Sequence, residues 1–120
     1  PLHTIMPGMA VKDGRAVMPF GVMGGGYQPF GHAHFITNLV DYGMDPQQAL
    51  DAPRVYYQDG KVEAEAGLSA DVAAALTGRG HTIVPTHEPL GGGQAVVIDW
   101  DRGTLTGASD PRKDGCALGY

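Results

Sequence analysis

The stretch that decides the fold is Gly21-Val22-Met23-Gly24-Gly25-Gly26, which joins a predicted strand to a predicted helix. Glycine clusters of this kind suit turns in which the backbone itself approaches something closely. A glycine turn at a helix N-terminus can present backbone N–H groups to an anion, either a bound phosphate or the transient oxyanion of acyl transfer. A tight turn that binds nothing fits the same spacing, and the spacing alone favours that alternative. The stretch is no Walker loop, because it contains no Gly-Lys-Ser/Thr.

The helix that follows the glycine stretch is predicted over about Pro29 to Tyr42. Phe35 and Leu39 lie on one stripe with Tyr42, and further apolar residues lie beside that stripe. Because apolar residues cover most of the circumference, we expect this helix to be largely buried. Gly43 is a plausible C-cap.

Two Asp-Gly pairs, Asp13-Gly14 and Asp59-Gly60, predict tight hairpin turns, since they supply the positive φ angles that such turns need. Short strands are predicted on both sides of each turn, and further strands are predicted in the C-terminal part of the chain. The predicted strands are Thr4 to Val11, Ala16 to Val22, Arg54 to Gln58, Lys61 to Ala66, His81 to Thr86, Gln94 to Trp100 and Thr104 to Ala108.

Two more helices are predicted between these strands. Asp45 caps the first, Gln48 can close a capping box with it, and this helix must end before Pro53. Ser69 begins the second, and its apolar residues Val72 and Leu76 are expected on a buried face. Antiparallel hairpins interleaved with a few helices make the fold class α+β.

Composition sets the broad class of the protein. The chain has 120 residues, of which 42% are apolar and 18% charged, so we expect a folded domain rather than a disordered chain. A net charge of −5 gives no electrostatic footprint for nucleic acid or an anionic membrane surface. No apolar run approaches the roughly 20 residues that span a bilayer. The sequence leaves the cellular compartment open.

The remaining reactive residues predict little chemistry. His32 and His34 point to different faces of a helix, and no acidic or cysteine cluster stands at ligand spacing, so no metal site is expected. Cys116 has no base positioned beside it and is interpreted as a small packed residue. Pro1 could act as the general base of a tautomerase, but it is interpreted as a cut end of the chain.

Several segments taken together are far more specific than any one of them. In their order and spacing they resemble the γ-glutamyltranspeptidase family, including its bacterial amidohydrolase-like members. This resemblance implies a fold, the four-layer αββα sandwich of the N-terminal-nucleophile hydrolases, and it implies that residues 1–120 are the C-terminal portion of the small catalytic subunit. The segments are Pro1–Pro7, Lys12–Gly14, Gly21–Gly25, Asp41–Met44, Ala49–Arg54, Gly80-His81 and Gly107–Gly115.

The resemblance also implies a mechanism that needs no cofactor. An autoproteolytic cut makes a threonine the new N-terminus of the small subunit, and this threonine attacks an amide with its own α-amine as the base. By resemblance, the nucleophile precedes Pro1, Gly24 and Gly25 form the oxyanion hole with their backbone N–H groups, and His3 and Thr4 occupy the positions that bind the γ-glutamyl α-carboxylate. The implied partners are a γ-glutamyl or other acyl-amide substrate, the large subunit and the upstream part of the small subunit.

Two departures from the family pattern bear on specificity. His3 and Thr4 replace a Ser-Ser pair, and Val22-Met23 replaces Ser-Pro before the glycines. Both favour an amidohydrolase-like enzyme that hydrolyses more than it transfers. The isolated chain is predicted to be inactive and to self-associate, without binding nucleic acid or membrane. The alternative from another class is a noncatalytic binding or structural module that retains the fold.

Overall fold

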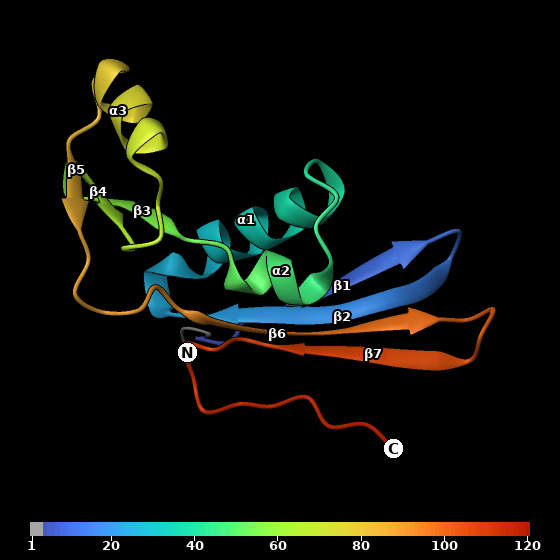
Figure 1. Cartoon of the computed structure of the whole chain (residues 1–120). Helices are drawn as coiled ribbons and strands as arrows, with labels where there is room; N and C mark the ends of the chain where they lie inside the picture. The colour runs from blue at the N-terminus through green and yellow to red at the C-terminus, as the bar shows by residue number, and fades with distance from the viewer. Residues whose placement is uncertain (1–3) are drawn as a thin grey trace. The chain divides into compact units, whose positions relative to one another are not determined.

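The computed structural model describes residues 4–120, so the predicted substrate-binding residue His3 lies outside the described residues. The chain divides into two compact units, one formed by Pro1–Asp51 with Gly91–Tyr120 and the other by Ala52–Leu90. Each unit combines a sheet with helices, as Figure 1 shows. The predicted α+β class is therefore confirmed.

The first unit is built on a four-stranded antiparallel sheet with strand order β1-β2-β6-β7. Asp13 and Gly14 turn β1 into β2 with φ angles of 52° and 77°, which confirms the first predicted hairpin. A register shift between Ala10 and Val11 interrupts the first hairpin, and β2 continues through Pro19, which pairs with Met9. The strands are β1 (Pro7–Lys12), β2 (Arg15–Met23), β6 (Gly92–Asp99) and β7 (Thr104–Ser109).

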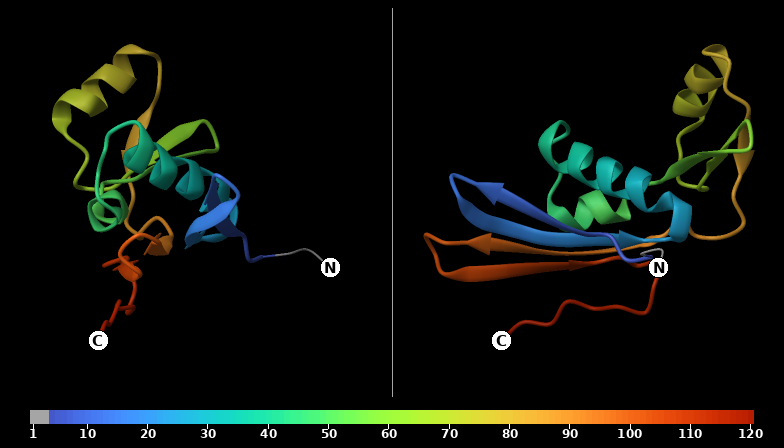
Figure 2. Two further views of the ribbon diagram at one scale, coloured as in Figure 1. Left: turned by 90° about the vertical axis from the view of Figure 1, so that its right-hand side faces the viewer. Right: turned by 180° about the vertical axis from the view of Figure 1, so that it is seen from behind.

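Helices cover one face of this sheet, as the view from behind in Figure 2 also shows. Their contact residues form the core of the unit: Phe35 packs against Phe20 with ring centroids 5.6 Å apart, and Leu50 is fully buried. The expectation that the first helix is largely buried is wrong, because only Gln28, Gly31, Phe35 and Asn38 are buried. Val40 at its end is 74% exposed, and Tyr42, which lies beyond the end of the helix, is 72% exposed. The elements are η1 (Gly25–Tyr27), α1 (Gln28–Val40) and α2 (Pro46–Asp51).

The predicted capping box of α2 is present. The Gln48 N–H donates to Asp45 Oδ1 at 2.8 Å, and the Asp45 N–H donates to Gln48 Oε1 at 3.2 Å. These reciprocal bonds satisfy donors that a helix start leaves free. The helix ends at Asp51, before Pro53, as predicted.

The sheet face that points away from the helices is apolar and partly open. Side chains alternate between the two faces of a strand, so Met9 and Leu105 lie on the face opposite Phe20 and Ala108. Met9 is 54% exposed and Leu105 is 70% exposed. The C-terminal tail runs along this side of the sheet, where a Cβ on Gly107 would lie 2.8 Å from Ala117 Cβ (Figure 1).

The second unit has a three-stranded sheet with strand order β3-β4-β5. The strands β4 and β5 pair in parallel, which corrects the expectation of antiparallel pairing throughout. The reason is the connection: α3 lies between them in the chain, and a helical crossover brings the second strand back in the same direction. The elements are β3 (Val55–Gln58), β4 (Lys61–Ala64), α3 (Ala70–Gly78) and β5 (Ile83–Pro85).

The helix α3 starts as predicted but is not buried. The Ser69 hydroxyl accepts the Val72 N–H at 3.3 Å, which is an N-cap bond. No residue of this helix is buried, and Val72 is 47% exposed. The predicted buried face with Val72 and Leu76 is therefore wrong, since Leu76 is only half-buried and Val72 is exposed.

Candidate active site

The glycine stretch forms the turn between β2 and the first helical residues. The strand ends at Met23, Gly24 has φ 134° and Gly25 has φ 57°. Residues other than glycine rarely adopt such angles, so the backbone path itself requires glycine here. Gly24, Gly25 and Gly26 are all exposed.

The carbonyl groups of this turn point into the helix that follows. The Gly24 carbonyl accepts the Tyr27 N–H at 3.0 Å, and the Gly25 carbonyl accepts the Gln28 N–H. In a trans peptide the N–H points opposite to the C=O. The N–H groups of Gly25 and Gly26 therefore point away from the helix. Of the two predicted donors, Gly25 is the one whose N–H direction these bonds fix. A Cβ built on Gly25 would meet no atom within 4 Å, so the space on the Cβ side of this residue is open.

A second glycine cluster, residues 91–93, packs against the backbone of the turn. A Cβ on Gly24 would lie 2.9 Å from Gly91 Cα, and a Cβ on Gly91 would lie 2.4 Å from the Met23 carbonyl oxygen. Only two glycines allow the two backbones to lie this close. Residues 91–93 are all glycine in the sequence, but no local pattern shows which segment they contact.

The predicted substrate-binding residue Thr4 is exposed and is linked to the glycine turn. The side-chain amide of Gln28 donates to the Thr4 carbonyl at 2.8 Å and to the Gly25 carbonyl at 3.2 Å. Gln28 itself is only 5% exposed. The structure therefore brings Thr4 and the turn together through a residue that the sequence did not single out. The one signal in the sequence that could have indicated this role is a polar residue, Gln28, in the first turn of a largely apolar helix.

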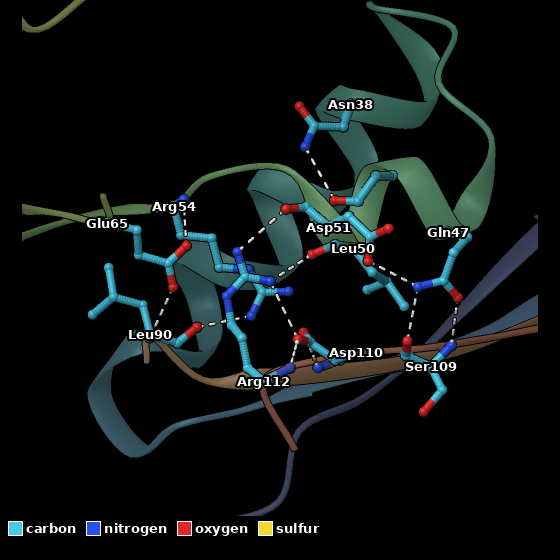
Figure 3. Close-up of polar contacts among 12 residues, drawn as sticks. Asn38, Gln47, Leu50, Asp51, Arg54, Glu65, Leu90, Ser109, Asp110 and Arg112 are labelled. Carbon is cyan, nitrogen blue, oxygen red and sulfur yellow. Dashed lines mark hydrogen bonds and ion pairs between the residues drawn. The ribbon is translucent and has the colours of Figure 1, made fainter. Parts of the chain in front are cut away.

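A buried ion pair holds the start of β6 against α2 (Figure 3). Asp110 is fully buried, and its carboxylate accepts the Gly93 N–H at 2.7 Å. Arg112 donates to the same carboxylate at 3.2 Å and to the Leu50 carbonyl at 2.8 Å. The guanidinium neutralises the buried charge and also caps the C-terminal end of α2, where carbonyl groups lack helical partners. This cluster positions the strand that follows Gly91.

Buried polar contacts also join the two ends of the second unit, and Figure 3 shows the residues that make them. Arg54 is 3% exposed and donates to the Leu90 carbonyl at 2.8 Å. The Glu65 carboxylate accepts the Arg54 N–H at 2.9 Å and the Leu90 N–H at 3.1 Å. The two ends of the unit are thereby joined by the arginine of the Ala49–Arg54 segment.

The other candidate residues do not gather into a site. His32 Nδ1 lies 2.6 Å from the Gln28 carbonyl, and its ring packs on Phe20. Within residues 4–120, no three His, Cys, Asp or Glu side chains are grouped to hold a metal ion. Cys116 is exposed, so its interpretation as a packed residue is wrong. Among the described residues, no helix has the length and apolar character to cross a membrane.

Comparison with solved structures defines the class of protein first. The chain superposes with a TM-score of 0.90 on a cephalosporin acylase from Bacillus halodurans, at 40% identity over 98% of this chain and 23% of that chain. It superposes with a TM-score of 0.86 on a γ-glutamyltranspeptidase from Pseudomonas nitroreducens, at 25% identity over 99% of this chain and 63% of that chain. These neighbours place the fold among the N-terminal-nucleophile hydrolases.

Comparison with sequences then gives the family. Residues 1–120 match the family model described as gamma-glutamyltranspeptidase, so the chain belongs to the γ-glutamyltranspeptidase family. The glutathione hydrolase-like YwrD proenzyme of Bacillus subtilis is 36% identical over 98% of this chain and 24% of its own length. The chain thus spans about a quarter of the length of that curated relative.

Proposed function

We propose that this chain supplies the oxyanion hole of an enzyme that cleaves an amide through an acyl-threonine intermediate. The observation that carries the proposal is the turn at Gly24 and Gly25. Its carbonyls are held by the following helix, its residues are exposed, and open space lies in front of Gly25. Membership of a family whose members are named hydrolases, acylases and transpeptidases supports it.

The proposed mechanism uses the turn when negative charge develops. An N-terminal threonine outside this chain attacks the amide carbonyl carbon, and its α-amine takes the hydroxyl proton. The carbonyl oxygen becomes an oxyanion and accepts hydrogen bonds from the backbone N–H groups of Gly24 and Gly25. The C–N bond then breaks, the amine leaves with a proton, and the acyl group stays on the threonine until water or an amine takes it. Each donor of such a hole contributes about 3 kcal/mol to transition-state stabilisation.

The remaining parts of the enzyme are proposed to lie outside residues 1–120. We propose that the chain is the C-terminal portion of the small subunit, preceded by the segment that carries the nucleophile and associated with a large subunit. The small share of the YwrD proenzyme that the chain covers supports this arrangement.

The acyl group is proposed to contact the segment around Thr4. The Thr4 hydroxyl can donate one hydrogen bond to a carboxylate of the acyl group. Its exposure and its link to the glycine turn support this role. His3 is bulkier than the serine it replaces, so we propose that the complete enzyme hydrolyses its acyl-enzyme more than it transfers the acyl group to amines.

The test compares two glycines with the same backbone geometry in the complete enzyme. Gly25 has φ 57° and Gly103 has φ 65°, and a Cβ at either position would meet nothing within 4 Å. Gly25→Ala and Gly103→Ala should therefore cost similar stability, about 1–2 kcal/mol each. Only Gly25→Ala should lower kcat for γ-glutamyl-p-nitroanilide, by about tenfold or more, because its methyl group enters the space proposed for the substrate. Equal kcat values for the two variants would contradict the proposed site.

A further inference from the structure

Gln28 is a buried polar side chain in the first turn of α1. It is 5% exposed, and its Nε2 atom donates to two carbonyl oxygens, at 2.8 Å to Thr4 and at 3.2 Å to Gly25. A primary amide has two N–H donors, and this geometry uses both of them. The backbone of the same residue contributes too, because its N–H donates to the Gly25 carbonyl and its carbonyl oxygen lies 2.6 Å from His32 Nδ1.

The two carbonyls that Gln28 holds belong to different segments. Gly25 is three residues away in the chain, and its carbonyl accepts from both the backbone and the side chain of Gln28. Thr4 is 24 residues away. The pairing of β1 with β2 begins at Pro7, opposite Gly21, so Thr4 lies beyond the last pair of the sheet. The Gln28 amide therefore fastens a segment that strand pairing does not hold.

We propose that Gln28 is a positioning residue that sets the distance between the oxyanion turn and the acyl-binding segment at Thr4, and thereby controls which acyl groups are cleaved. The inference rests on the function proposed above. A substrate bound at both places must span a fixed gap between its reacting carbonyl and the far end of its acyl group. A rigid link between the two protein segments fixes that gap, and small displacements of a bound substrate cost large factors in rate.

Glutamine suits this role better than methionine or glutamate, the side chains of similar size. Methionine has nearly the same length but no donor, so Gln28→Met would leave two carbonyls without this partner. Glutamate at neutral pH only accepts hydrogen bonds and would repel both carbonyl oxygens. Gln28→Met is therefore the variant that removes the link with the least change in shape.

The chain offers a matched control in Gln47. Its side-chain amide also joins two distant segments, since Nε2 donates to the Ser109 carbonyl at 2.9 Å and Oε1 accepts the Ser109 N–H at 3.0 Å. This link ties α2 to β7 and involves neither Thr4 nor the glycine turn. Gln47 is exposed, and its Nε2 also donates to Asp51 Oδ1 at 2.8 Å. Gln47→Met therefore removes a glutamine bridge between segments from a place outside the proposed site.

The experiment measures acyl-group preference in the complete enzyme with two substrates. γ-Glutamyl-p-nitroanilide has a charged end that can reach Thr4, whereas butyryl-p-nitroanilide carries the same amide and no group for that segment. For Gln28→Met, the ratio of kcat/KM for the γ-glutamyl to the butyryl substrate should fall about tenfold, which corresponds to about 1.4 kcal/mol, close to one neutral hydrogen bond. For Gln47→Met the ratio should stay as in the wild type. A general loss of structure would lower both rates alike and leave the ratio unchanged, whereas loss of the proposed link changes the ratio. An unchanged ratio in Gln28→Met would therefore overturn the inference.

Hydrogen–deuterium exchange gives a second readout that needs no activity. Amide exchange in residues 4–8 and 24–27 should become at least tenfold faster in Gln28→Met than in the wild type, while β6 and β7 stay protected. Unchanged exchange in residues 4–8 would overturn the inference, as would equal loss of protection across the whole first unit. If the wild-type enzyme cleaves neither anilide, the proposed function fails, and these exchange rates alone decide whether Gln28 is the link.

Discussion

At the scale of single residues, the molecule depends on buried polar groups that bind backbone atoms of distant segments. Gln28, Asp110 and Arg54 are each 5% exposed or less, and each contacts backbone atoms at least 17 positions away. A buried polar group stabilises a fold when it is fully paired and destabilises it when a partner is lost. These residues therefore fix how loops and helix ends lie against the sheet.

The first prediction concerns the ion pair of Asp110 and Arg112. Arg112→Met removes a cation that lies 3.2 Å from a fully buried carboxylate. Loss of one partner of a buried pair costs about 3–5 kcal/mol, so the midpoint of thermal unfolding of the complete protein should fall by several degrees.

The control for this prediction is Arg102→Met. Arg102 faces Asp99 at 3.8 Å, but its side chain is 82% exposed. Exposed pairs of this kind contribute little, so the midpoint should not change measurably. Equal losses for the two variants would contradict the role given to Asp110.

Local residue signals predicted the turns and the N-terminal caps of α2 and α3, but not the links between segments. Asp13-Gly14 and Asp59-Gly60 both adopt positive φ angles, because turn geometry depends on neighbouring residues alone. The contact between Gln28 and Thr4 depends on how β1 meets α1, which no local pattern encodes. For the same reason, the sequence could place Gly24 in a turn but could not show that Gly91 supports it.

At the scale of elements, order and type of the strands and helices followed from the sequence, whereas burial did not. A strand was predicted over Gln94 to Trp100, and β6 lies there, between β2 and β7 in its sheet. The helix α3 was predicted from its apolar spacing to have a buried face, yet none of its residues is buried in this chain. Periodicity shows that a helix has an apolar side, but only the neighbouring elements decide what covers it.

The open sheet face leads to a prediction about the isolated chain. Met9, Met23 and Leu105 are at least 54% exposed, and β1 and β7 are the edge strands of the sheet. Exposed apolar surface and strand edges promote association. The isolated 120-residue chain should therefore form dimers or larger species in light scattering, and Leu105→Lys should reduce this association.

The control for association is a matched substitution away from the sheet face. Val40 lies at the end of α1 and is 74% exposed, close to the 70% of Leu105. Val40→Lys should leave the particle size of the isolated chain unchanged. A monomeric wild-type chain at high concentration, or equal effects of the two lysines, would contradict a role for the sheet face.

At the scale of the whole molecule, this chain is proposed to contribute one part of an active site. The family is established by the match over residues 1–120 and by the structural neighbours. The turn at Gly24 and Gly25 is proposed to stabilise charge, and the nucleophile is proposed to lie elsewhere in the complete protein. A hole without its nucleophile leaves little catalysis: in a studied serine protease, loss of the nucleophile costs roughly six orders of magnitude in kcat.

The most direct test is to assay the isolated 120-residue chain and the complete protein side by side on γ-glutamyl-p-nitroanilide and butyryl-p-nitroanilide. The account predicts release of p-nitroaniline by the complete protein and none above background by the isolated chain. Thr4 is not expected to act as the nucleophile, because it is preceded by other residues and has no free α-amine to act as a base. Turnover by the isolated chain that survives repurification and disappears in Thr4→Ala would contradict the account, since it would place the nucleophile within these 120 residues.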